Sequence, residues 1–303
     1  MVSSVRDQAE GLRRLLVQDI LRIVSITSGN SGAGKTTTVI SLAHALSDKG
    51  KNVLVVDENV GASNIAATLG LNAHRDLLDV IRRDRGLEEV LIASPAGFRI
   101  LQAGQGMRVL ERLNADEQEH LVNAFARIAE PVDVVLIDAA RERNGLSLPL
   151  NVPGHEIVVV ISPDPASITA AYALIKHNSG RIKKQGKQER HCFRILVNKA
   201  ASDIEARTIF ENMKRAAAQY LDVSLDLAGF IPLDNKLCLK DAERRTRPVA
   251  RAEAAFRQIA ESLIHWPGQK NEGNGLDQFI QRLLRSAQSS SNNTSSAIAA
   301  VSR

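Results

Sequence analysis

A glycine-rich stretch near the start of the chain has the residue types and the spacing of a phosphate-binding loop. Gly29, Gly34, Lys35 and Thr36 fit the pattern G-x-x-x-x-G-K-[ST]. In that pattern the glycines let backbone N–H groups face a phosphate, the lysine reaches the β- and γ-phosphates, and the hydroxyl holds Mg²⁺. We therefore predict a nucleotide-binding loop made of Gly29, Asn30, Ser31, Gly32, Ala33, Gly34, Lys35, Thr36 and Thr37.

The segments on either side of the loop are the ones that such a loop requires. Residues 23–27 form a β-branched apolar run that predicts a strand, and residues 38–49 carry apolar side chains at helical spacing. The alternative is a glycine turn that ends in Lys-Thr by chance. The order of strand, loop and helix favours the phosphate-binding interpretation.

Two further apolar runs, 52–57 and 132–138, end in the carboxylates Asp57 and Asp138. Continuous apolar strands of this kind are typical of a parallel sheet that is covered on both faces. Carboxylates at the ends of such strands hold Mg²⁺ in nucleotide sites, so we predict a metal site formed by Thr36, Asp57 and Asp138. The alternative is that each aspartate only caps a helix or a turn.

The alternation of strands and helices predicts an α/β fold, with a doubly wound, mostly parallel sheet and ligands at the carboxyl ends of the strands. The other predicted strands are 98–102, 157–161, 193–197 and 225–231, and the other predicted helices are 76–83, 116–130, 166–185, 203–220 and 251–266. We expect an N-terminal arm at 1–20, the α/β domain at 21–266, a linker at 267–275, an amphipathic helix at 276–286 and a disordered tail at 287–303.

The composition is that of a soluble globular protein, with 303 residues, 44% hydrophobic and 24% charged. No apolar run approaches the roughly 20 residues that a membrane span needs, and the start of the chain lacks a signal-peptide core, so we expect a cytoplasmic protein. The two cysteines, Cys192 and Cys238, lack metal-ligand spacing and are expected to be reduced. A net charge of +5 permits contact with anionic lipid or nucleic acid without requiring either.

The order of these motifs resembles the MinD/ParA class of deviant P-loop ATPases, and within it the FlhG (FleN) group of MinD-like regulators of flagellar number. The resemblance implies that ATP or ADP binds with Mg²⁺, that Asn198 and Pro232 border the adenine, and that ATP drives homodimerisation. It rests on the phosphate loop and on the segments 7–13, 53–64, 133–138, 162–176, 196–199 and 229–234.

Three positions depart from the family pattern. Asn30 stands where the family has a lysine that reaches the partner's phosphates, Asn59 stands where it has an aspartate that orients the attacking water, and Ala140 replaces a glycine of switch II. Glu58 is adjacent to Asn59, but successive side chains of an extended segment point to opposite sides, so we expect it to be a poor substitute. We infer that the protein binds ATP with Mg²⁺ and hydrolyses it very slowly or not at all.

A second possibility is that a nearby arginine supplies the missing cation. Arg141 and Arg143 follow switch II, and a solvated loop face explains them equally well. The candidate catalytic residues are therefore Asn59, Asn30 and Arg141, all of them substitutes for the family residues.

Both ends of the chain carry amphipathic patterns. The resemblance implies that the arm, through Asp7, Gln8, Leu12 and Arg13, docks on the SRP-type GTPase FlhF and stimulates its GTP hydrolysis. It also implies that the C-terminal helix is a reversible membrane anchor on an anionic bilayer; the alternative is a helix folded back on its own domain. The apolar face of this helix consists of Leu276, Phe279, Ile280, Leu283 and Leu284.

The first hypothesis for function is thus an ATP-binding regulator of flagellar number and placement, which dimerises with nucleotide, associates with the inner face of the cell membrane and acts on FlhF. A flagellar switch component or transcription regulator is a further possible partner. The second hypothesis is a non-hydrolysing adaptor that holds ATP as a structural ligand. The third is a ParA-type partitioning ATPase bound to DNA, which the two terminal helices disfavour. A basic cluster at 236–251 is the feature that would support nucleic-acid binding.

Overall fold

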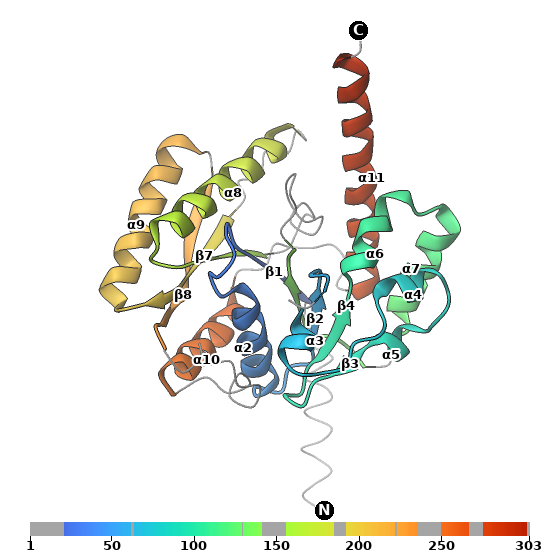
Figure 1. Ribbon diagram of the computed structural model, residues 1–303, viewed down its shortest axis with the longest axis horizontal. Coiled ribbons are helices and arrows are strands. Elements are labelled where there is room, and N and C mark those ends of the chain that lie inside the picture. The colour runs from blue at the N-terminus through green and yellow to red at the C-terminus, as the bar shows by residue number, and fades with distance from the viewer. Residues whose placement is uncertain are drawn as a thin grey trace, which may run out of the picture.

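The computed structural model describes residues 21–61, 64–128, 130–140, 156–184, 192–221, 223–234, 250–266 and 275–301, with side chains to residue 179 in the helix that ends at 184 and to residue 288 in the last helix. Its centre is an eight-stranded sheet with the order β3-β4-β2-β5-β1-β6-β7-β8 (Figure 1). β3 pairs antiparallel with β4, and the other neighbours are parallel. The strands are β1 (Arg22–Thr27), β2 (Val53–Asp57), β3 (Ile92–Ala93), β4 (Arg99–Gln102), β5 (Val134–Asp138), β6 (Glu156–Ile161), β7 (Cys192–Ala200) and β8 (Ser224–Pro232).

Helices cover both faces of this sheet, which confirms the predicted doubly wound α/β fold. Val24 and Ile26 of β1 belong to the core that α2 and α10 complete, while Ile23 belongs to the core on the opposite face with α7 and α11. The helices are α2 (Lys35–Ser47), α3 (Ile65–Thr68), α4 (Leu77–Ile81), α5 (Leu87–Val90), α6 (Gly104–Val109), the 3₁₀ turn η1 (Leu110–Arg112), α7 (Ala115–Ala126), α8 (Pro165–Lys184), α9 (Asp203–Tyr220), α10 (Ala250–His265) and α11 (Leu276–Val301).

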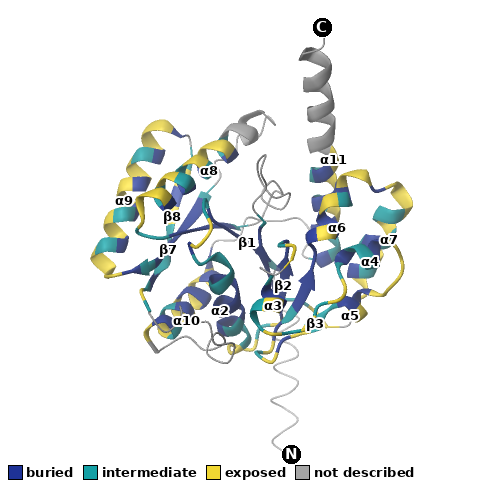
Figure 2. Ribbon diagram, viewed as in Figure 1, coloured by how far each residue is buried: buried dark blue, intermediate teal, exposed yellow. Residues whose placement is uncertain are grey.

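The central strands are buried on both faces, as their continuous apolar sequences predict (Figure 2). Every strand predicted from the sequence is present within two residues at its ends, apart from β7, which runs three residues further to Ala200. Five short elements are not predicted from the sequence: β3, α3, α5, α6 and η1. These elements span two to six residues, too short for a hydrophobic period to be recognised.

The C-terminal helix differs from the expectation of an exposed membrane anchor. Leu276, Phe279, Ile280, Leu283 and Leu284 are all at most 8% exposed and belong to the core beneath α4 and α7. Apolar residues at helical spacing fit a core face as well as a lipid face, and here the domain itself covers them. The structure therefore has the helix folded back on its own domain, the alternative left open above.

α11 also continues to Val301, although the sequence predicts a disordered tail from residue 287. No glycine or proline interrupts 276–301, so no strong helix breaker divides the segment, although Ser, Asn and Thr of lower helix propensity fill 289–296. The arm at 1–20 and the linker at 267–274 lie outside the described residues. Within the described helices, none is long and apolar enough to cross a membrane.

Candidate functional site

The predicted loop lies between the carboxyl end of β1 and the start of α2, at the centre of the sheet. It forms one wall of a pocket of about 770 Å³, to which segments from distant parts of the chain contribute. Of the predicted loop residues, all except Gly29 line this pocket, and the predicted residues Asn59, Asn198 and Pro232 line it as well. The pocket also contains side chains that sequence reasoning did not assign to it: Ser28, Glu58, Val60, Arg108, Lys199, Asp234 and Phe256.

Gly29 is needed for packing. A Cβ at this position would lie 2.2 Å from the carbonyl carbon of Ala170, so α8 approaches the loop as closely as a glycine allows. Asn30 lies at the same contact, where its Oδ1 accepts a hydrogen bond of 3.0 Å from the Ser167 hydroxyl. Since Ser167 is fully buried, Asn30 ties the loop to α8.

Gly34 makes a second close approach, at the start of α2. Its φ of +93° is in the left-handed region, and a Cβ there would lie 2.0 Å from Nδ2 of Asn198. Asn198 Nδ2 donates to the Ala33 carbonyl at 2.8 Å, and Lys199 Nζ donates to the Gly32 carbonyl at 2.8 Å. Asn198, predicted to border the base, thus also holds the loop in shape from β7.

Replacing Gly34 with alanine is therefore expected to weaken nucleotide binding more than it weakens the fold. The left-handed backbone costs an alanine about 1–2 kcal/mol, and Asn198 must leave the Ala33 carbonyl. Calorimetric titration with ADP and Mg²⁺ measures the first effect and thermal unfolding the second. Gly50→Ala is the matched control, because its φ is +75° but a Cβ there meets nothing within 4 Å. Equal nucleotide affinity in the two variants would contradict the expectation.

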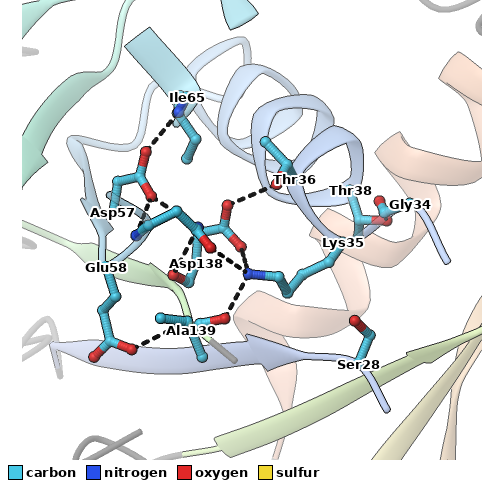
Figure 3. A network of polar contacts seen from close by, with 12 residues as sticks. Ser28, Gly34, Lys35, Thr36, Thr38, Asp57, Glu58, Ile65, Asp138 and Ala139 are labelled. Atoms are coloured by element: carbon cyan, nitrogen blue, oxygen red, sulfur yellow. Dashed lines mark hydrogen bonds and ion pairs between the residues drawn. The ribbon is translucent and has the colours of Figure 1, made fainter. Parts of the chain in front are cut away.

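The polar contacts of two pocket residues, Lys35 and Thr36, converge on Asp138, at the end of β5 (Figure 3). Lys35 Nζ lies 2.5 Å from Asp138 Oδ1 and donates to the Ala139 carbonyl at 2.5 Å, while Thr36 Oγ1 donates to Asp138 Oδ2 at 2.9 Å. Asp57 pairs with Asp138 in the β2–β5 register, and both carboxylates are fully buried. The structure thus brings together Thr36, Asp57 and Asp138, the residues predicted to hold a metal.

This donor set fits Mg²⁺. The ion prefers oxygen ligands and is usually held by one or two carboxylates together with waters and phosphate oxygens. A hydroxyl and a carboxylate oxygen already meet at Thr36 and Asp138, and the carboxylate of Asp57 lies on the neighbouring strand. Among the described residues no group of three or more His, Cys, Asp or Glu side chains could hold a metal ion without such help. When bound, the ion would neutralise phosphate charge.

Burial raises the pKa of Asp57, and the nearby charge of Asp138 adds to this, while N–H groups of Ile65 and Asn59 act in the opposite direction. The folded protein therefore binds this proton more tightly than the unfolded chain does. The resulting stabilisation is present at acid pH and is lost as the pH rises through the raised pKa. We expect the stability of wild type minus that of Asp57→Asn, measured by urea unfolding in EDTA, to fall as the pH rises above about 4. A constant difference would contradict this.

Asn59 and Glu58 are placed differently from the sequence expectation. Asn59 Nδ2 donates to Asp57 Oδ1 at 2.9 Å, and its Oδ1 lies 3.5 Å from Lys35 Nζ, so this amide supports the metal site. Glu58 does not point away: it is 5% exposed, it lines the pocket, and its Oε2 accepts a hydrogen bond of 2.9 Å from the Ala140 N–H. The strict alternation of a strand ends at Asp57, so it does not fix the direction of these two side chains.

Several predicted residues cannot be placed. Arg141 and Arg143, the candidate substitute cations, lie outside the described residues, as does the basic cluster up to residue 249. The same holds for Asp7, Gln8, Leu12 and Arg13 of the arm. Arg108 of α6, which the sequence analysis did not consider, is a basic side chain that the described part of the chain does bring to the pocket.

The fold and the site together define a P-loop nucleotide-binding protein. The model of the CobQ/CobB/MinD/ParA nucleotide binding domain matches residues 24–247, and the chain belongs to this family. It is 32% identical over 271 residues to the antiactivator FleN of Pseudomonas aeruginosa, covering 88% of this chain and 94% of FleN. It is 26% identical to the flagellum site-determining protein YlxH of Helicobacter pylori, covering 87% and 90% of the two chains.

Solved structures support the fold. The MinC:MinD cell division protein complex of Aquifex aeolicus matches with a TM-score of 0.59 and 22% identity, over 83% of this chain and 98% of that one. MinD of Pyrococcus horikoshii, solved with Mg-ADP, matches with a TM-score of 0.55 and 21% identity, over 80% and 96%. The family model and the identity to FleN confirm the predicted MinD/ParA class and the resemblance to FleN.

Proposed function

We propose that this protein is a FleN-like regulator of flagellar number and placement, which binds ATP or ADP with Mg²⁺ and switches by nucleotide-dependent dimerisation. The observation that carries the proposal is that Lys35 and Thr36, which line the pocket, both contact Asp138, beside Asp57 on the neighbouring strand, in a chain 32% identical to FleN. The arm at 1–20 would be the segment that binds an FlhF-like GTPase and stimulates its GTP hydrolysis. The nucleotide itself would only set which state of the protein is populated.

In this proposal hydrolysis is slow. Asn30 carries no charge, and its Oδ1 accepts a hydrogen bond from Ser167. Asn59 donates a hydrogen bond to Asp57 and accepts one from Lys35. An amide cannot accept a proton from water as a carboxylate can. A cation supplied to the transferring phosphate is worth about 10³ to 10⁵ in turnover where it acts, so its loss alone would make hydrolysis slow.

The test is calorimetric titration with ADP and with ATP, each with Mg²⁺, together with a phosphate-release assay. We expect both nucleotides to bind and phosphate release to be slow. Absence of binding would overturn the proposed function, and turnover comparable to that of ordinary MinD proteins would overturn the slow-hydrolysis part. Sedimentation velocity with each nucleotide then tests dimerisation, for which the ATP-bound protein should be the larger species.

Action on a GTPase has its own test. A peptide of residues 1–20 is expected to raise the GTP hydrolysis rate of an FlhF-like protein, and a peptide with Gln8→Ala is expected to lose the effect. An unchanged rate with the first peptide would refute this partner.

A non-hydrolysing adaptor is the second candidate, and the engagement of both Asn30 and Asn59 in contacts within the chain favours it. The two candidates separate on phosphate release alone, because the adaptor binds ATP without any turnover.

A further inference from the structure

Glu58 places a carboxylate in the pocket where the phosphate loop would hold a polyphosphate. The two negative charges repel each other, so a carboxylate at this position calls for a role. Glu58 lines the same pocket as the phosphate loop, and its side chain is almost fully buried. Its Oε2 accepts a hydrogen bond of 2.9 Å from the Ala140 N–H, and this bond joins the segment after β2 to the segment after β5. This contact therefore links two of the walls that face a bound nucleotide.

The position of the Ala140 N–H indicates which phosphate would meet it. Ala140 lines the pocket together with Lys35, and Lys35 Nζ donates to the carbonyl of the preceding residue, Ala139. A phosphate-loop lysine reaches the β- and γ-phosphates. In the proposal, a triphosphate held by Lys35 therefore brings its terminal phosphate to the part of the pocket wall that Ala140 forms, next to this N–H and to the carboxylate that already binds it.

The backbone of Glu58 is fixed, so the competition falls on its side chain. Its N–H donates to the Asp138 carbonyl at 3.2 Å, and its own carbonyl packs against Gly104 of α6, where a Cβ would lie 2.7 Å from the oxygen. Two anions cannot share one N–H donor at low cost. A triphosphate must therefore turn the Glu58 side chain away, whereas a diphosphate leaves the contact in place.

We propose that Glu58 discriminates triphosphate from diphosphate nucleotides: its carboxylate holds the Ala140 N–H when the site is empty or contains a diphosphate, and the terminal phosphate of a triphosphate displaces it. This inference rests on the proposed nucleotide binding. In this role Glu58 favours ADP over ATP in the pocket. Loss of the Glu58–Ala140 hydrogen bond is then the change that a terminal phosphate causes in the segments after β2 and β5.

The test compares wild type with Glu58→Gln by calorimetric titration with Mg·ADP and with Mg·ATPγS, a slowly hydrolysed triphosphate. We expect the variant to bind ATPγS about tenfold more tightly or better, which is the scale of removing one like charge from a partly screened site, and to gain less affinity for ADP, so that the ratio of the two affinities changes. Glu58→Ala, which also removes the acceptor, should shift the ratio in the same direction. Thermal unfolding confirms that each variant is folded.

Asp234→Asn is the matched control, because Asp234 is another carboxylate of the same pocket, beside Pro232 and far in sequence from switch I. It is expected to shift both affinities alike and to leave their ratio unchanged. If both Glu58 variants keep the wild-type ratio of ATPγS to ADP affinity, the inference is overturned while the proposed function stands. A variant that loses turnover but keeps this ratio overturns the inference in the same way. If wild type binds neither nucleotide, both fail.

Discussion

Lys35→Ala is expected to lower nucleotide affinity by at least about 100-fold and, in the nucleotide-free protein, to cost about 3–5 kcal/mol of stability. The second effect follows from the geometry. The Lys35 ammonium lies 2.5 Å from Asp138 Oδ1, and the Asp138 side chain is 0% exposed. Removing one partner of a buried ion pair leaves the other charge without compensation. Urea unfolding and calorimetric titration measure the two effects separately.

The double variant Lys35→Ala/Asp138→Asn separates the two effects. Neutralising Asp138 removes the uncompensated charge, so most of the lost stability should return. Nucleotide binding should not return, because the cation for the phosphates and a carboxylate for Mg²⁺ are then both missing. If the double variant is no more stable than Lys35→Ala, the buried ion pair does not explain the destabilisation. If Lys35→Ala binds ADP like wild type, the phosphate-binding role of the loop is wrong.

The parts of the site that the sequence predicts are those whose position follows from local pattern. A glycine loop after a strand, and an aspartate at the end of each of two buried strands, must meet at one edge of a parallel sheet, and Lys35, Thr36, Asp57 and Asp138 do so. The continuous apolar sequences of β1, β2 and β5 likewise predict strands that are buried on both faces of the sheet. In these elements the regular geometry of the sheet fixes which residues lie close together, so their spacing in the sequence predicts the contact.

The pocket positions of Glu58 and Arg108 lie beyond the reach of such patterns. Glu58 follows the last residue of β2, where alternation no longer sets the direction of a side chain, and it lines the pocket together with the predicted Asn59. Arg108 comes from α6, a helix of six residues without a recognisable period. Contacts between two loops depend on tertiary packing, which a single sequence does not display.

The packing of α11 gives a second expected effect on stability: Phe279→Ala should cost about 3–5 kcal/mol, as for a large aromatic side chain removed from a core. Phe279 is 2% exposed, and it shares its hydrophobic cluster with Leu121 and Phe125 of α7. Gln281→Ala is the matched control, since Gln281 is an exposed residue of the same helix and its loss should change stability by less than about 0.5 kcal/mol. Urea unfolding compares the two. Equal stability of the two variants would mean that α11 does not dock on the domain in solution.

The docked helix also sets a condition on membrane association. The residues that would enter a bilayer are the ones that the domain covers, so α11 must leave its site before it can bind lipid. Leu121→Ala weakens that site without altering the helix, and under the anchor proposal it should increase co-sedimentation with anionic liposomes. Phe279→Ala weakens docking as well but removes apolar surface from the anchor, so it should increase binding less. If Leu121→Ala leaves liposome binding unchanged, α11 acts as a structural helix of the domain, because freeing it then has no consequence at a membrane.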